Sequence, residues 1–382
     1  MTKFSQINKK FKIILAFSLF GVLSENAFAA GIDNLIENNN ANLPKHQYKL
    51  IFEKDKKTHE SQDFLLNDTC TKRGNQLLAS YAQAKYRLPK QYDIRLSIAK
   101  TISEANTIFP VYNDGNLGAI SANAAAGAIQ FKRIYEKLSN YVPSRLMIYY
   151  NERKDNGLDV TQDTGDSISD AVAAIVKWGA CNETLWPYSD SSTSTPNFTQ
   201  QPSATCYKNA LRDMDLDNVA HANIPQDKNT LQAFKNSLYN NNPILIGINM
   251  YPSFISSIST GGIIPMPNLQ TEVILGPLAL MATGYNDKTS LFTVRSSFGA
   301  TYVGANGTKP IGDYGYFYLP YDYLTNPDLA ADFWMVAKVG THTKSTIYSN
   351  LTCYSSYAFS TTKYIVSAPF KVLSYLKSTF IG

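Results

Sequence analysis

Cysteine and histidine are the side chains of this sequence best suited to nucleophilic catalysis, because a thiolate held beside an imidazolium attacks a carbonyl carbon efficiently. The chain has four of each among its 382 residues. A catalytic thiol is expected at the start of a helix, where the helix dipole lowers its pKa. No cysteine follows a glycine-rich turn at the start of a predicted helix; the four are Cys70, Cys181, Cys206 and Cys353. The residue types are present, but not in a catalytic pattern.

The N-terminal region has the pattern of a secretory signal peptide. A basic stretch at 8–12 precedes the apolar run 13–23, and Ala27 and Ala29 supply the small residues of a cleavage site. The sequence therefore predicts a signal peptide over residues 1–29 and a secreted, periplasmic or extracellular mature chain. A membrane anchor is disfavoured because the apolar run is shorter than the ~20 residues of a spanning helix. We expect no transmembrane anchor in the mature chain.

Export to an oxidising compartment makes disulfide bonds the expected state of the cysteines. Several pairings of four cysteines are conceivable. The chain order favours an inner pair, Cys181 with Cys206, and an outer pair, Cys70 with Cys353. The inner bond would contribute about 3 kcal/mol by restricting the unfolded chain. Buried free thiols are the alternative.

Composition and charge exclude several functional classes. Hydrophobic residues make up 44%, aromatic residues 12% and charged residues 17% of the chain, which excludes a disordered or polytopic membrane protein. Residues 1–29 hold four lysines and one glutamate, which leaves +2 of the net charge of +5, so we expect no nucleic-acid partner. The acidic run 213–218 lacks the glycine and glutamate of a calcium loop. Since no nucleotide-binding glycine pattern is present either, we expect no cofactor and no metal site.

The distribution of apolar residues predicts an α+β protein, with helices in the first half and antiparallel strands in the second. The alanine-rich stretch 119–138 follows a glycine-punctuated turn and is expected to be the central, buried helix. We expect the two halves to face each other across a cleft. Other helices are predicted over 75–86, 167–178 and 229–238, and strands over 244–250, 278–285, 291–296 and 314–320.

Five segments resemble, in order, the motifs of papain-family cysteine peptidases. Residues 88–95 (LPKQYDIR) resemble the start of the mature enzyme, and 110–118 (PVYNDGNLG) the loop before its nucleophile. Residues 279–287 (ALMATGYND) are similar to the strand that follows the catalytic histidine. Residues 294–299 (VRSSFG) and 312–317 (GDYGYF) are similar to the stretch with the catalytic asparagine and the strand after it. The resemblance implies a papain-like two-subdomain fold with a central helix packed against an antiparallel β-barrel-like sheet, with N- and C-terminal extensions.

The resemblance also divides the chain. It implies a papain-like domain over residues 88–338. Residues 30–87 are an N-terminal extension similar to a pro-segment, but they are short for that role, and we expect them to be retained. Residues 339–382 form a C-terminal tail, which the outer disulfide would tie to the N-terminal extension.

In this family a cysteine thiolate attacks, a histidine transfers the proton, an asparagine orients the histidine, and a glutamine helps to hold the oxyanion. The corresponding positions here are Ile120, Leu278, Ser296 and Asp114. Isoleucine and leucine can neither attack a carbonyl nor transfer a proton, and a carboxylate would repel a developing oxyanion. The separation of 158 residues between the first two positions is close to the family spacing of roughly 130–150. The resemblance therefore implies a catalytically degenerate member.

A serine cannot replace the missing thiol without a base to remove its proton. Ser121 lies next to the nucleophile position, and Ser297 next to the asparagine position. The histidines all lie outside the motifs; they are His46, His59, His221 and His342. The sequence therefore offers no base for a serine mechanism.

The function that the sequence favours is that of a secreted papain-like pseudo-peptidase. Its cleft would bind a peptide or protein, as a scaffold or decoy, without cleaving it. Two alternatives stay open. One is an active papain-family cysteine peptidase whose catalytic residues are misaligned here, which a reactive thiol would reveal. The other is a structural or surface-adhesion protein, in which deletion of the extensions would abolish binding.

Overall fold

The computed structural model describes residues 49–52, 69–83, 87–191, 193–213, 219–257, 261–300 and 313–338. The predicted signal peptide and C-terminal tail lie outside these ranges, as do His46, His59 and His342. Cys353 also lies outside them, so its bond with Cys70 stays a prediction. None of the described helices is long and apolar enough to cross a membrane.

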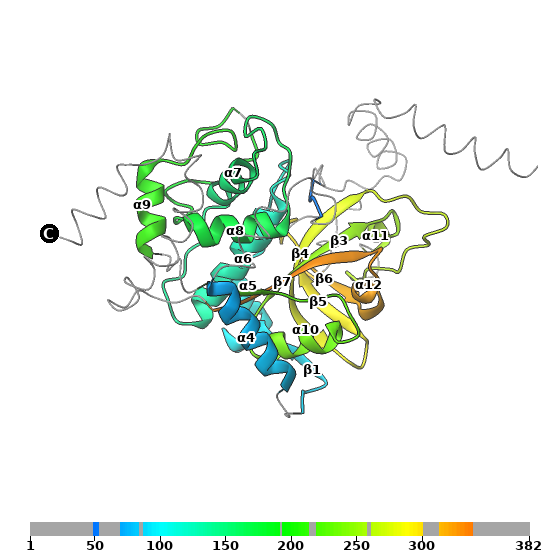
Figure 1. Cartoon of the computed structure of the whole chain (residues 1–382). Coiled ribbons are helices and arrows are strands. Elements are labelled where there is room, and N and C mark those ends of the chain that lie inside the picture. The colour runs from blue at the N-terminus through cyan, green and yellow to red at the C-terminus, as the bar shows by residue number, and fades with distance from the viewer. Residues whose placement is uncertain are drawn as a thin grey trace, which may run out of the picture.

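The helical half of the molecule is built around a central helix, α6 (Ile120–Tyr135), as the sequence predicted (Figure 1). This helix is buried from Ile120 to Arg133. The other helices of this half are α5 (Ile102–Ile108), α7 (Arg145–Asp155), α8 (Ile168–Trp178) and α9 (Ala204–Asp213). Small alanine side chains let α7, α8 and the sheet approach α6 closely. Helices α7 and α8 each begin after a serine, Ser144 and Ser167, whose hydroxyl accepts a main-chain N–H of the first turn.

The other half is one antiparallel sheet in the order β2-β7-β3-β4-β5-β6, with β1 also paired to β4. Its strands are β1 (Gln91–Asp93), β2 (Ala220–Asn223), β3 (Ile244–Met250), β4 (Gly276–Asn286), β5 (Leu291–Arg295), β6 (Tyr316–Pro320) and β7 (Ala330–Lys338). The remaining helical segments are α4 (Thr69–Gln83), η2 (Ile94–Ser97), α10 (Thr230–Tyr239), α11 (Ser253–Ser256) and α12 (Tyr321–Thr325). All four predicted strands are found, each within two residues of its predicted ends.

The expected barrel-like closure is wrong, because the sheet is open. In the described part of the chain, β2 pairs only with β7 and β6 only with β5 among the named strands, so the two ends of the sheet do not meet. Helix α4 lies against β2 instead. A Cβ atom at Gly74 would lie 1.8 Å from the carbonyl oxygen of His221, so the helix and the strand are in direct backbone contact. The edge of the sheet is therefore covered by a helix of the predicted N-terminal extension.

A second piece of that extension, residues 49–52, lies between the two halves (Figure 1, the short blue segment). Leu50 and Phe52 are buried. The N-terminal extension thus contacts the protein body at two places, the junction of the halves and the edge of the sheet. These contacts match the expectation that it is a permanent part of the protein, which stays a prediction.

Candidate functional site

Ile120 is the first residue of the central helix. The preceding loop turns at Gly115, which has a φ of 61°, and Ala119 provides no side-chain cap for α6. The side chain of Ile120 is fully buried. Ile120 therefore lies at the N-terminal end of α6, where the helix dipole would act on a nucleophile. The side chain there is a hydrocarbon, so nothing at this position can be activated.

Leu278 lies on β4 and pairs with Ile248 of β3. Like Ile120, it is fully buried, and both side chains belong to one continuous hydrophobic core. Helix α6 packs directly against β4. The positions predicted to correspond to the thiol and the imidazole are therefore part of the packing between the two halves.

Asp114 and Ser296 both make hydrogen bonds between separate loops. Ser297 donates its hydroxyl to Asp114 Oδ2 at 2.7 Å, and the Asp114 N–H donates to the Ser297 carbonyl at 2.9 Å. Ser296 donates its hydroxyl to the Gly315 carbonyl at 2.8 Å. The Gly299 N–H reaches the Tyr112 carbonyl at 2.8 Å. The structure places Asp114 against Ser297, the neighbour of Ser296, and the side chains of all three make structural hydrogen bonds.

The serine next to Ile120 has no histidine partner. Ser121 donates its hydroxyl to Glu152 Oε1 at 2.9 Å, and both side chains are fully buried. Of the histidines, the structure describes His221, which lies on β2 with its Nδ1 2.9 Å from the Val219 carbonyl. Strands β7 and β3 separate β2 from β4. Ser121 and His221 therefore cannot form a catalytic pair.

Residues 49–52 lie at the junction of the two halves, where the sequence predicted a cleft. The Ile51 N–H donates to the Asp166 carbonyl at 3.2 Å. The Lys49 ammonium contacts the main chain and carboxylate of Asp163, and that carboxylate also accepts the Gly118 N–H at 3.1 Å. Asp163 thus links the segment to the loop that leads into Ile120.

Two glycines make room for this segment. A Cβ at Gly165, whose φ is 68°, would lie 1.6 Å from the Lys49 carbonyl oxygen. A Cβ at Gly247 on β3 would lie 2.6 Å from the Phe52 ring and 3.2 Å from Leu50. We call the residues that receive the segment the extension seat: Gly118, Asp163, Gly165, Asp166 and Gly247. The seat joins the helical half to the sheet.

The extension seat was missed at the sequence level. Its partners lie far apart in the chain; Lys49 and Asp163, for example, are separated by 114 positions. The one local signal is the apolar triplet Leu50, Ile51 and Phe52 within an otherwise polar extension. Such a triplet predicts burial but not its location.

An ion pair supports the loop before α6. Arg145 binds Glu183 with two nitrogens, at 2.7 and 2.8 Å. Its third nitrogen donates to the Asn113 carbonyl and to Asn123 Oδ1, each at 2.9 Å. Since Asn113 belongs to the loop and Asn123 to the first turn of α6, Arg145 fixes one against the other.

The inner disulfide is present as predicted. Cys181 and Cys206 are bonded, and join the residues after α8 to helix α9. Both sulfurs are buried beside Met147. These two cysteines are therefore excluded as free nucleophiles.

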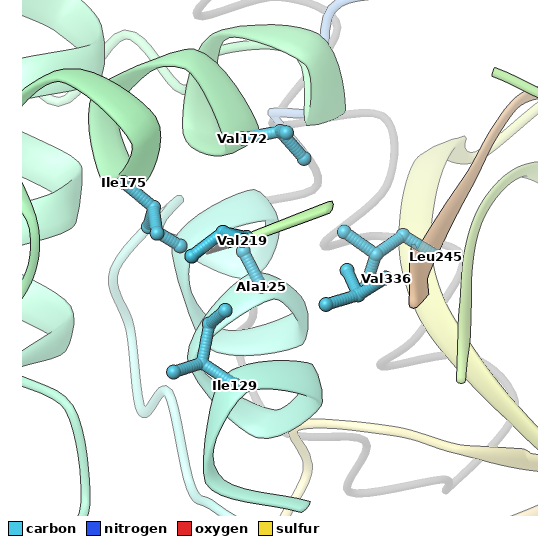
Figure 2. Close-up of a pocket in the computed structure, with 7 residues that line it drawn as sticks. All are labelled: Ala125, Ile129, Val172, Ile175, Val219, Leu245 and Val336. Atoms are coloured by element: carbon cyan, nitrogen blue, oxygen red, sulfur yellow. The ribbon is translucent and has the colours of Figure 1, made fainter. Parts of the chain in front are cut away.

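A cavity at the junction of the two halves is too small to be a ligand site. Figure 2 shows the residues that line it, which come from α6, α8 and the region of the sheet. Its volume is about 10 Å³. Its lining is entirely apolar: Ala125, Ile129, Val172, Ile175, Val219, Leu245 and Val336. A space this small would admit one water molecule at most, and it offers that water no polar partner. The described residues also hold no group of three acidic, cysteine or histidine side chains able to bind a metal ion.

Comparison with known proteins decides the family. No model of a protein family matches the sequence. An uncharacterized peptidase C1-like protein of Acanthamoeba polyphaga mimivirus is 32% identical over 259 residues, which cover 66% of this chain and 76% of that protein. The chain belongs to the papain-like cysteine peptidase family. Membership fixes the ancestry, while activity depends on the residues at the site.

Solved structures of papain-like proteases agree with this assignment. Xylellain, a cysteine protease from Xylella fastidiosa, is 32% identical and has a TM-score of 0.55, over 70% of this chain and 90% of xylellain. Procathepsin B S9 from Trypanosoma congolense has a TM-score of 0.50 over 84% of this chain and 99% of its own. At 15% identity, the second similarity supports the fold alone.

Proposed function

We propose that this papain-like protein is a secreted pseudo-peptidase that binds extended polypeptide without cleaving it. One observation carries the proposal. Ile120 is the first residue of the central helix, and Leu278 is at the predicted histidine position. Both are fully buried aliphatic side chains in one hydrophobic core. A peptidase of this family needs a thiolate and an imidazolium there, and neither hydrocarbon can be ionised.

The extension seat indicates what kind of polypeptide the site accepts. It offers a carbonyl acceptor at Asp166, a carboxylate at Asp163 and an apolar surface over Gly247. The chain's own segment meets these features with a main-chain N–H, a lysine and two apolar side chains. We propose that a partner would be an extended peptide with apolar residues at alternate positions and a basic residue before them. The extension occupies the same place, so a partner peptide must compete with it.

Export is part of the proposal. The predicted signal peptide supports it, and the Cys181–Cys206 bond is of the kind that persists in oxidising compartments. A binding protein outside the cell would need no catalytic set for a scaffold or decoy role.

Restoring the missing residues tests the lack of catalysis. In a variant with Ile120→Cys, Leu278→His and Ser296→Asn, the new imidazole should lower the pKa of the new thiol. The matched control carries Ile120→Cys and Ser296→Asn but keeps Leu278. At pH 6, iodoacetamide should label the triple variant several times faster than the control. Equal rates in two folded proteins would contradict the predicted correspondence of these positions.

Peptide binding is tested with a labelled peptide of residues 47–54. It should bind a full-length variant whose own segment carries Leu50→Ser and Phe52→Ser more tightly than it binds the unmodified protein. A peptide with the same two serine substitutions is the control. Equal affinity for the two peptides would contradict a seat that reads apolar side chains, and cleavage of the bound peptide would contradict the pseudo-peptidase.

A further inference from the structure

Residues 261–275 form a loop between α11 and β4 that exposes several large aliphatic side chains. We call it the aliphatic loop. Of the ten large hydrophobic residues that are exposed in the described part of the chain, five lie here: Ile263, Met266, Leu269, Val273 and Ile274. Val273 is 73% exposed. In Figure 1 the loop projects beyond α11, on the side of the molecule away from α7, α8 and α9. Exposed apolar residues gathered in this way mark an interaction surface.

The aliphatic loop carries almost no charge. Glu272 is the one charged residue between Pro243 and Asp287 in the sequence. Its carboxylate is occupied within the fold: Oε2 accepts the Ser253 N–H and Oε1 accepts the Asn268 N–H, each at 2.7 Å. The surface that the loop presents is therefore matched to hydrocarbon rather than to a charged ligand such as nucleic acid.

Main-chain hydrogen bonds anchor the aliphatic loop to the sheet at both ends. The Ile264 N–H donates to the Tyr318 carbonyl of β6 at 2.9 Å, and the Leu275 N–H donates to the Met250 carbonyl of β3 at 2.7 Å. Two prolines between these anchors restrict the backbone further. The aliphatic side chains are thus presented by an anchored backbone, which lowers the entropy cost of covering them.

The size of this surface favours a lipid interface over a second copy of the chain. A stable protein–protein interface buries about 800 Å² on each partner, which is more than five partly exposed side chains present. Insertion of aliphatic side chains at the boundary between lipid headgroups and acyl chains has no such requirement, and its strength grows with whatever apolar area is buried.

We propose that the aliphatic loop docks the protein reversibly on a zwitterionic lipid surface, with its aliphatic side chains inserted at the level of the headgroups. The loop has no lysine or arginine to attract anionic lipid. The exposed Asp328 lies at the base of the loop, where its carbonyl accepts the Asn249 side chain at 2.8 Å. Anionic lipid should therefore weaken binding. This surface lies outside the extension seat, so the proposal does not depend on the proposed function.

Flotation of the full-length protein with phosphatidylcholine vesicles tests the proposal. A single myristoyl chain binds membranes with an association constant of about 10⁴ M⁻¹, so we expect half of the protein to be bound at about 0.1–1 mM lipid. Vesicles that also contain phosphatidylserine should bind less protein, and added salt should not release it from phosphatidylcholine. Absence of binding at about 10 mM lipid would overturn the proposal. So would binding that requires phosphatidylserine and is lost in salt.

Substitutions in the aliphatic loop assign the binding to it. A double variant with Leu269→Ser and Val273→Ser should bind vesicles about tenfold more weakly or worse, because two apolar side chains are lost. Leu96→Ser is the matched control, since Leu96 is an exposed aliphatic residue of η2; its binding should equal that of the unmodified protein. Equal binding by the folded double variant would overturn the proposal. A dimer that the double variant abolishes, without vesicle binding, would assign the loop to a second copy instead.

Tryptophan fluorescence reports whether the loop enters the lipid. In a Val273→Trp variant, vesicles should shift the added emission to shorter wavelength, and phosphatidylcholine brominated on its acyl chains should quench it. Leu96→Trp is the control and should show neither effect. Bound protein whose tryptophan at position 273 is not quenched would overturn insertion of the loop. Peptide binding and cleavage play no part in these measurements, so their failure is distinct from failure of the proposed function.

Discussion

Truncating Phe52 to alanine should unseat the N-terminal extension without unfolding the protein. The Phe52 side chain is 5% exposed and its ring lies over Gly247, where a glycine leaves space for it. Burial of a phenylalanine side chain contributes about 1.5–3 kcal/mol. Since about 1.4 kcal/mol changes an equilibrium constant tenfold, opening of the seat should increase by a factor between about ten and about a hundred.

The assay is hydrogen–deuterium exchange of residues 49–52 at one pH, with thermal unfolding measured in parallel. Leu96→Ala is the matched control, because Leu96 is a large apolar residue that is 53% exposed and should cost less than about 0.5 kcal/mol. The reasoning requires a large rise in exchange at the segment and little at β3. Unchanged protection at 49–52 would refute it, because the ring would then contribute nothing to the seat.

Three further predictions follow from the structure. Gly165→Ala places a Cβ on the Lys49 carbonyl, so exchange at 49–52 should rise while the fold loses only about 1 kcal/mol; protection equal to that of the unmodified protein would contradict the packing. In the unmodified protein the raised pKa of Glu152 means that the folded state loses stability as the pH rises and this carboxyl is ionised. Glu152→Gln should therefore reduce the fall in unfolding free energy between pH 4 and pH 7, by up to about 1.4 kcal/mol per pH unit. Parallel plots of the urea-unfolding free energy against pH for the two proteins would contradict this. Replacing Cys181 and Cys206 by serine should cost about 2–5 kcal/mol in urea unfolding and leave exchange at 49–52 unchanged, whereas loss of protection there would mean that α9 and the extension seat are coupled.

The strands that the sequence predicted well are those whose apolar pattern is uninterrupted. Strand β3 is buried at every position from Ile244 to Met250 and is bounded by Asn242 and Pro243. Strand β7 was missed although it is longer, because Asp332, with a φ of 56°, interrupts its pattern. Strand β1 has three residues, and its existence depends on pairing with β4 almost two hundred positions away.

Helix α7 is part of the core, but the sequence did not predict it because several of its buried residues are polar or charged. Arg145, Glu152 and Arg153 are all buried there, and a helix carrying them does not have an apolar stripe in its sequence. Their burial depends on partners from other segments: Glu183 for Arg145, and Ser121 for Glu152. Such partners are visible only in the folded chain.

The candidate site was also predictable only in part from the sequence. The helix start at Ile120 was predictable within one residue, because a glycine-rich turn followed by an alanine-rich stretch is a local signal. The arrangement of Asp163, Gly165 and Asp166 around residues 49–52 was not, because it depends on contacts between distant segments.

Labelling of the unmodified protein with an epoxide cysteine probe, without reducing agent, tests the central claim most directly. Intact mass measured after incubation at pH 5–7 reports any adduct, and an unstructured peptide in the same tube reports hydrolysis. The account predicts no adduct and an intact peptide. One probe molecule bound per chain, at a cysteine whose labelling abolishes peptide hydrolysis, would contradict it and identify an active peptidase.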